Sequence, residues 1–118
     1  MPNPVVHFEI QTQEPEKVQK FFADLFDWHV DADNPMSYGV VDTHAGGIGG
    51  GIGPAQGANQ VTFYVEVDDL QAYLDKAESL GGKTLMPPTE IPDMVTFAMF
   101  ADPQGNTVGL VKPEDSRS

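Results

Sequence analysis

The amino-acid sequence predicts an α+β fold in which one domain of 118 residues contains two β-α-β-β-β modules. Two observations support this prediction. Strand patterns of period two alternate with helical apolar stripes, and the order strand, helix, strands occurs twice along the chain. The segments HFEI (7–10) and TFYV (62–65) stand at equivalent places in the two copies. Because each helix is followed by several strands, two such modules fit better than a βαβαβ parallel sheet. We place module one at about residues 4–55 and module two at about 60–113.

Module one begins with a predicted strand over residues 5–12, which alternates and is rich in β-branched and aromatic residues. Its alternation puts Val6, Phe8 and Ile10 on one face and Val5, His7 and Glu9 on the other. Residues 13–28 predict a helix with Pro15 in the first turn, followed by a strand over residues 37–44. The helix has an apolar stripe that we expect to be core: Val18, Phe21, Phe22, Leu25 and Phe26.

Module two repeats this order. Residues 60–69 predict a strand in which Val61, Phe63, Val65 and Val67 alternate with Thr62, Tyr64 and Glu66, and we expect the valine and phenylalanine face to lie under the helices. Asp68 or Asp69 can cap the helix over residues 70–82, and Gly81 or Gly82 can end it. Residues 83–92 are extended, but Pro87 and Pro88 exclude a central strand. Residues 94–113 predict two strands joined by the turn DPQG.

Composition excludes several classes of function. A net charge of -12 with six basic residues argues against a nucleic-acid partner and favours a neutral or cationic ligand over an anion. The absence of cysteine excludes disulfides, zinc-thiolate sites and thiol nucleophiles. Apolar stretches are too short for a membrane span, and the first residues lack the pattern of a signal peptide. We therefore predict a cytoplasmic protein with no membrane or nucleic-acid partner.

Residues 46–53 contain six of the twelve glycines. The run matches neither common phosphate-binding glycine pattern, and no predicted helix follows whose amides could hold a phosphate. A flexible linker is a poor explanation because Ile48 and Ile52 interrupt the run inside a module. The remaining interpretation is a glycine-rich strand or strand pair, where missing side chains let another part of the protein, or a ligand, come close.

Three stretches resemble the vicinal oxygen chelate superfamily of glyoxalase I, bleomycin-resistance proteins and extradiol dioxygenases: VHFEIQTQEPEKVQKFFADLFDW, VTFYVEVDDLQAYLDKAESLGG and FADPQGNTVGLVKP. The resemblance covers most of the chain. It implies a curved, mixed sheet of eight strands around a cup, with the helices on the outer face. It also implies a homodimer in which cups or modules are shared between chains.

The resemblance also implies where a metal would bind, because metal-using members place ligands on the first and last strands of each module. His7 matches the first such position. The second falls within Gly49 to Gly53, where no ligand side chain exists; Thr62 stands where a histidine is usual, and Gly109 where glutamate is common. Since a divalent cation typically needs three or more imidazole or carboxylate donors, we expect neither the family metal site nor another cofactor.

The candidate ligand-binding residues, which would line the cup if the resemblance holds, are His7, Glu9, Thr62, Tyr64, Phe100 and Gly109. The alternative is that the polar faces of these strands are merely solvated. His7 and Glu9 are the best catalytic candidates, with His7 as a general base, a remnant of a metal site or a hydrogen-bonding group. Trp28 and Tyr38 either wall a ligand pocket or serve ordinary packing.

Three functions stay open at this point. The first is metal-free binding of a small, partly hydrophobic molecule. The second is a metal-dependent lyase, isomerase or dioxygenase with an unusual donor set, drawn from His7, Glu9, Asp42, His44 and Glu66. The third is a non-catalytic dimer or partner module with a vestigial cavity. The sequence does not decide whether the protein is an enzyme.

Overall fold

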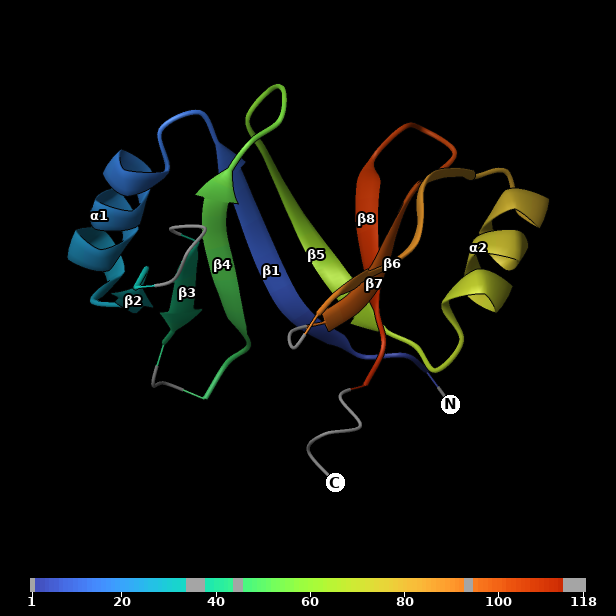
Figure 1. The fold of residues 1–118 in the computed structure, drawn as a ribbon, viewed down its shortest axis with the longest axis horizontal. Coiled ribbons are helices and arrows are strands. Elements are labelled where there is room, and N and C mark those ends of the chain that lie inside the picture. The colour runs from blue at the N-terminus through green and yellow to red at the C-terminus, as the bar shows by residue number, and fades with distance from the viewer. Residues whose placement is uncertain (1, 34–37, 44–45, 93–94, 114–118) are drawn as a thin grey trace. The chain divides into compact units, whose positions relative to one another are not determined.

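A computed structural model describes residues 2–33, 38–43, 46–92 and 95–113 (Figure 1). The elements follow the order β1 (Val5–Thr12), α1 (Pro15–Phe26), β2 (His29–Asp31), β3 (Gly39–Asp42), β4 (Gly49–Pro54), β5 (Gln60–Glu66), α2 (Leu70–Ser79), β6 (Lys83–Ile91), β7 (Val95–Ala101) and β8 (Thr107–Val111). This order confirms the α+β fold of two β-α-β-β-β modules and adds β2, which the sequence did not single out. None of the helices in the described ranges has the length and apolar character needed to cross a membrane.

The chain divides into two compact units. The N-terminal unit is Val6–Thr62, and the C-terminal unit combines Met1–Val5 with Phe63–Ser118. The first residues belong to the C-terminal unit in part because the carbonyl oxygen of Pro4 accepts a hydrogen bond from the amide of Glu66 at 3.0 Å.

In the N-terminal unit the strands lie in the order β2-β3-β4-β1. The pair β1–β4 is parallel, whereas β2–β3 and β3–β4 are antiparallel. Helix α1 packs on β4 and β2 of the same unit (Figure 1). It begins at Pro15, whose missing N–H costs nothing in the first turn, and ends at Asp27 in the left-handed region with φ 61°.

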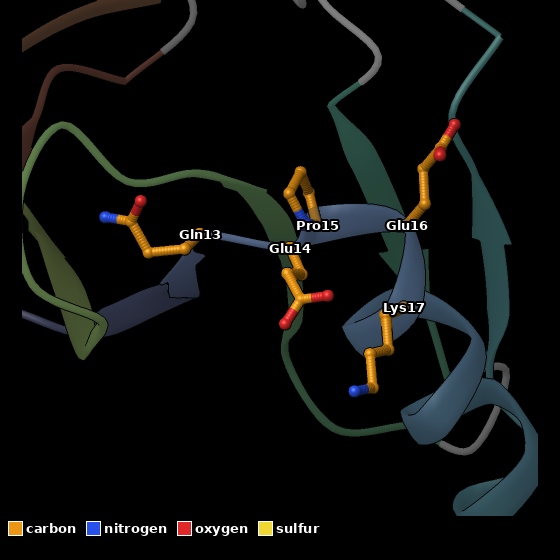
Figure 2. A pocket seen from close by; sticks show the side chains of 5 residues that line it. All are labelled: Gln13, Glu14, Pro15, Glu16 and Lys17. Carbon is orange, nitrogen blue, oxygen red and sulfur yellow. The ribbon is translucent and has the colours of Figure 1, made fainter.

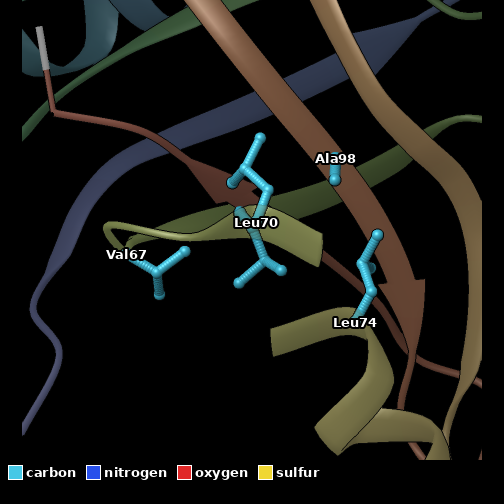
Figure 3. Close-up of a cluster of buried hydrophobic side chains, with 5 residues drawn as sticks. Val67, Leu70, Leu74 and Ala98 are labelled. Atoms are coloured by element: carbon cyan, nitrogen blue, oxygen red, sulfur yellow. The ribbon is translucent and has the colours of Figure 1, made fainter. Parts of the chain in front are cut away.

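In the C-terminal unit the order is β5-β8-β7-β6, with β5 parallel to β8 and the other pairs antiparallel. Helix α2 packs on β6 and β7. As predicted, Asp69 caps it by accepting a hydrogen bond from the amide of Ala72 at 3.0 Å, and Gly81 follows its end with φ 104°. A buried cluster lies beneath the helix and consists of Val67, Leu70, Leu74, Ala98 and Leu110. Figure 3 shows this cluster and labels its first four members.

Two further predictions in this unit are confirmed. Strand β6 lies at the end of the strand order, and its pairing with β7 is irregular between Met86 and Thr89, where Pro87 and Pro88 stand. Prolines are tolerated there because the outer side of an edge strand needs no donor. The DPQG segment is a turn, in which the amide of Gly105 donates to the carbonyl oxygen of Asp102 at 2.9 Å.

The apolar stripe of α1 is largely not core, contrary to the prediction. Phe21, Leu25 and Phe26 are each more than half exposed, whereas the buried side chain of the helix is Gln19 at 8% exposure. Gln19 donates a hydrogen bond to the carbonyl oxygen of Ile52 at 2.8 Å and lies against Gly39, where an added Cβ would come within 2.8 Å of it. Because the strands beneath α1 are rich in glycine, the helix lies close to their backbone and contacts them through a narrow part of its surface. Much of the apolar stripe therefore lies outside this contact.

The faces of β5 also depart from the prediction. Val61 is 72% exposed and Phe63 is 42% exposed, although both were expected under a helix. Only the far end of this face reaches the core, where Val65 packs against the cluster beneath α2. On the opposite face Thr62 and Tyr64 are 4% and 9% exposed, so the alternative of a solvated polar face does not hold for these two residues.

Candidate functional site

A hydrogen-bonded network in the N-terminal unit joins His7, Glu9 and Tyr38. Strand alternation puts His7 and Glu9 on one face of β1, and Tyr38 stands directly before β3. The hydroxyl of Tyr38 donates to Glu9 Oε2 at 3.1 Å and lies 3.3 Å from His7 Nε2. A phenol has one proton to donate, so with Glu9 ionised the hydrogen bond between Tyr38 and His7 requires the proton to sit on His7 Nε2.

The carboxylate of Glu9 is held on its other side as well. Gln11 Nε2 donates to Glu9 Oε1 at 2.8 Å, and Gln60 Nε2 donates to Gln11 Oε1 at 3.1 Å. Both oxygens of Glu9 therefore accept hydrogen bonds, Oε2 from Tyr38 and Oε1 from Gln11. Such an arrangement fixes the position of a half-buried carboxylate.

The glycines of β4 make room for the rings on either side of this strand. Gly51 lies opposite Glu9 in the β1–β4 register, and an added Cβ there would overlap the Tyr38 hydroxyl. At Gly53 an added Cβ would come within 2.6 Å of Tyr38 Cδ1, and at Gly50 within 2.5 Å of the Phe8 ring. The glycine run thus forms a strand from Gly49 onward, and the rings that approach Gly50, Gly51 and Gly53 are the protein's own side chains.

Burial sets the charge of His7. Removal from water lowers the pKa of His7 below its ordinary value of 6.5, and the negative charge of Glu9 opposes this shift without cancelling it. The imidazole is therefore neutral at neutral pH. A neutral imidazole with one fixed N–H can donate a hydrogen bond or accept a proton, but it does not add positive charge to the site.

In the C-terminal unit, Tyr64 and Gly109 are brought together. They are register partners between β5 and β8, and an added Cβ at Gly109 would overlap the Tyr64 ring. Phe97 faces Tyr64 with ring centroids 6.4 Å apart. The candidate Phe100 packs against the core cluster beneath α2, and β7 alternation puts it on the opposite face from Phe97.

The remaining candidates are dispersed. Asp42 is exposed on β3, where its register partner is His29, and His44 lies outside the described residues. Across the ranges that the structure describes, no group of three or more histidines and carboxylates could hold a metal ion. Trp28 belongs to an aromatic cluster with three phenylalanines, at centroid distances of 5.1 to 5.6 Å: Phe8, Phe22 and Phe26.

A surface depression of about 410 Å³ lies at the start of α1, lined by Gln13, Glu14, Pro15, Glu16 and Lys17 (Figure 2). Its lining contains none of the residues of the His7–Glu9–Tyr38 network. Open and formed largely by consecutive surface side chains, it offers no convergent set of polar groups of the kind that marks a ligand site.

A family model described as the Glyoxalase/Bleomycin resistance protein/Dioxygenase superfamily matches residues 5–110. The chain belongs to this superfamily. The resemblance stated from the sequence is thereby confirmed. "Putative glyoxylase CFP32" of Mycobacterium bovis and of Mycobacterium tuberculosis is 32% identical over 112 residues, a match that covers 86% of this chain and 42% of that protein. The chain thus spans less than half the length of these curated relatives.

Solved structures of other proteins share this fold. The hypothetical protein BH1468 from Bacillus halodurans has a TM-score of 0.72 at 10% identity, covering 98% of this chain and 97% of that one. Methylmalonyl-CoA epimerase from Mycobacterium tuberculosis has a TM-score of 0.67 at 12% identity, covering 96% and 89%. At these identities the likeness concerns the fold.

The residues present do not fit the metal that many superfamily members use. His7 supplies an imidazole, but its neighbour Tyr38 occupies the space above Gly51, and Tyr64 occupies the space above Gly109. The Thr62 hydroxyl is a poor donor for a divalent cation in place of a histidine. At these positions the chain therefore lacks the set of imidazole and carboxylate donors that a divalent cation needs.

Sequence reasoning left the role of Tyr38 open, and the structure makes this residue the centre of the network. A signal was present in the sequence. Glycines at positions 49, 51 and 53 alternate along one face of a strand, which leaves space on that face for a ring from elsewhere. The pattern indicates a filled space but not which aromatic residue fills it.

Proposed function

We propose that the chain binds a small, partly hydrophobic organic molecule through the polar groups of His7, Glu9 and Tyr38, without a bridging metal. The observation that supports this most is the Tyr38 hydroxyl between His7 and Glu9, at 3.3 and 3.1 Å. Three hydrogen-bonding groups of different kinds converge there within a superfamily whose fold hosts small-molecule sites. Such convergence of a few polar groups is typical of ligand recognition.

The charge of the site favours a neutral or cationic ligand. Glu9 adds a negative charge, neutral His7 adds no positive one, and the whole chain carries a net charge of -12. Apolar surface lies beside the network, since Val40 is the register partner of Gly51 and is exposed. A ligand with a polar head and an apolar body matches both features.

A proton-transfer reaction is the second candidate, favoured by the hydrogen bonds that orient His7. Here His7 would be the base, Tyr38 the group that orients it and Glu9 the group that holds Tyr38. Many acid–base catalysts use such an arrangement. Association as a homodimer and a cytoplasmic location stay predictions.

The test of the binding proposal is a thermal-shift screen in buffer with a chelator. The panel contains neutral and cationic aromatic compounds, with carboxylates of equal size as anionic controls. We expect neutral or cationic compounds to raise the melting temperature of the wild type, and the Tyr38→Phe variant to lose that shift. Binding that needs added Zn²⁺, Ni²⁺, Mn²⁺ or Fe²⁺, or that prefers the carboxylates, contradicts the proposal.

A further inference from the structure

We propose that a tyrosine ring replaces a superfamily metal ligand in each unit, Tyr38 over Gly51 and Tyr64 over Gly109. In the N-terminal unit this makes Tyr38 the residue that selects an organic ligand over a metal ion. The ligand class follows from the proposed function and rests on it, whereas the replacement itself rests on the ligand positions that the superfamily resemblance implies, together with strand register and packing.

Strand register identifies the replaced position in the N-terminal unit. His7 and Glu9 in β1 correspond to Thr62 and Tyr64 in β5, because the segments that contain them repeat in the two modules. Glu9 is the register partner of Gly51, and Tyr64 is the register partner of Gly109. Gly51 and Gly109 are therefore equivalent positions in the two modules. The second metal-ligand position, which the resemblance placed between Gly49 and Gly53, thus corresponds to Gly51.

The packing makes the tyrosine and a ligand side chain mutually exclusive at both positions. Any side chain on Gly51 would enter the space of the Tyr38 hydroxyl, and any side chain on Gly109 would enter the Tyr64 ring. Both glycines are buried. A carboxylate side chain at either position would have to displace the tyrosine. The absence of a metal-ligand side chain and the presence of the tyrosine ring are therefore coupled.

The exchange changes what the N-terminal unit can recognise. A carboxylate at Gly51 would add a second negative charge and further oxygen donors beside Glu9, which would favour a divalent cation. The Tyr38 hydroxyl instead offers a neutral group, already held by His7 and Glu9, that lies above the strand backbone. Such a group suits hydrogen bonding to an uncharged or cationic organic molecule.

A double-mutant cycle tests the steric part with melting temperature as the readout. Gly51→Ala should lower the melting temperature by roughly 5–10 °C, because the new methyl group displaces Tyr38. In a Tyr38→Ala background the same substitution should cost little. Gly47→Ala is the matched control, since an added Cβ there meets nothing within 4 Å. Additive effects of the two substitutions overturn the inference, whatever the wild type binds.

A gain of metal binding tests the functional part. The double variant Gly51→Glu with Tyr38→Gly should bind Ni²⁺ or Zn²⁺ on the order of tenfold more tightly than the wild type in calorimetry, and His7→Ala should abolish the gain. A folded double variant that binds these ions no better than the wild type overturns the inference. If the wild type binds none of the organic compounds, the proposed function fails, but the coupling of Gly51 and Tyr38 is unaffected.

Discussion

Tyr38 donates a hydrogen bond from its hydroxyl to Glu9 Oε2 at 3.1 Å, across an intervening strand. Glu9 lies in β1 and Tyr38 directly precedes β3, while β4 separates these two strands in the sheet order. The side chain can cross because Gly51 and Gly53 leave its path free. The glycine-rich strand and the polar network are therefore parts of one arrangement.

Removing the Tyr38 hydroxyl should weaken the fold measurably. Tyr38→Phe keeps the ring over Gly51 but deletes the hydrogen bonds to Glu9 and His7, of which one involves a charged acceptor. We expect the free energy of unfolding in urea to fall by about 1–3 kcal/mol. The control is Tyr73→Phe, which deletes an exposed hydrogen bond from Asn3 and should cost much less. Equal losses for the two variants would contradict the role given to Tyr38.

His7 should make stability depend on pH in a defined direction. Because burial lowers the pKa of folded His7 below 6.5, the unfolded chain binds a proton there at pH values where the folded chain does not. The contribution of His7 is therefore fully present above about pH 6.5 and is lost as pH falls from there through the folded pKa. Urea unfolding at successive pH values, with an NMR titration of the ring, measures both quantities.

Two variants, measured in the same titration, separate the effects of burial and of the Glu9 charge on the pKa of His7. His7→Gln should show a shallower loss of stability below about pH 6.5. Glu9→Gln removes the charge that opposes desolvation, so the pKa of His7 should fall further in that variant. A His7 pKa above 6.5 in the wild type would show that the charge of Glu9 outweighs burial.

Two helix leucines should differ strongly in their effect on stability. Leu74 of α2 is fully buried in the core cluster, whereas Leu25 of α1 is 57% exposed. Leu74→Ala should lower the free energy of unfolding by about 2–5 kcal/mol, and Leu25→Ala by less than about 1 kcal/mol. If both variants lose a comparable free energy of unfolding, especially one that depends on protein concentration, the exposed face of α1 is covered by another molecule in solution.

The buried side-chain amide of Gln19 should contribute to stability, although the sequence pattern predicts apolar residues on the buried face of α1. Gln19→Ala leaves the carbonyl oxygen of Ile52 without this donor, so unfolding should become easier by about 1–3 kcal/mol. Gln71→Ala on α2 is the matched control, because Gln71 is exposed and contacts Asp75 within its own helix. If both glutamines can be replaced at the same small cost, the Gln19 contact does not stabilise the unit.

Local patterns predicted most of the fold, since alternation, capping at Asp69 and the DPQG turn depend on residues close in sequence. Contacts between distant segments were harder to predict. The stripe of α1 looked like core because helical period reports which side chains share a face, but not how much of that face a glycine-rich sheet can cover. Likewise, the alternation of β5 separated Val61 from Thr62 correctly, but it did not reveal that the side of Val61 is exposed and the side of Thr62 is buried.

The candidate site was predicted in the same partial way. His7 and Glu9 were placed together by strand period alone, and the structure joins them through Tyr38, thirty-one residues from His7 in the chain. Phe100 was a candidate only because of the superfamily resemblance, since β7 has apolar residues on both of its faces and local pattern does not tell them apart; in the structure it packs against the core cluster beneath α2. No local pattern identifies the ring that lies over a glycine, because that contact is fixed only when the strands assemble.

The metal content of protein purified without chelator, measured by mass spectrometry together with that of His7→Ala, tests the central claim most directly. We predict substoichiometric Zn, Ni, Mn and Fe in the wild type, no change in the variant, and an unchanged melting temperature after treatment with EDTA. One equivalent of a divalent metal in the wild type that is absent from His7→Ala would contradict the account.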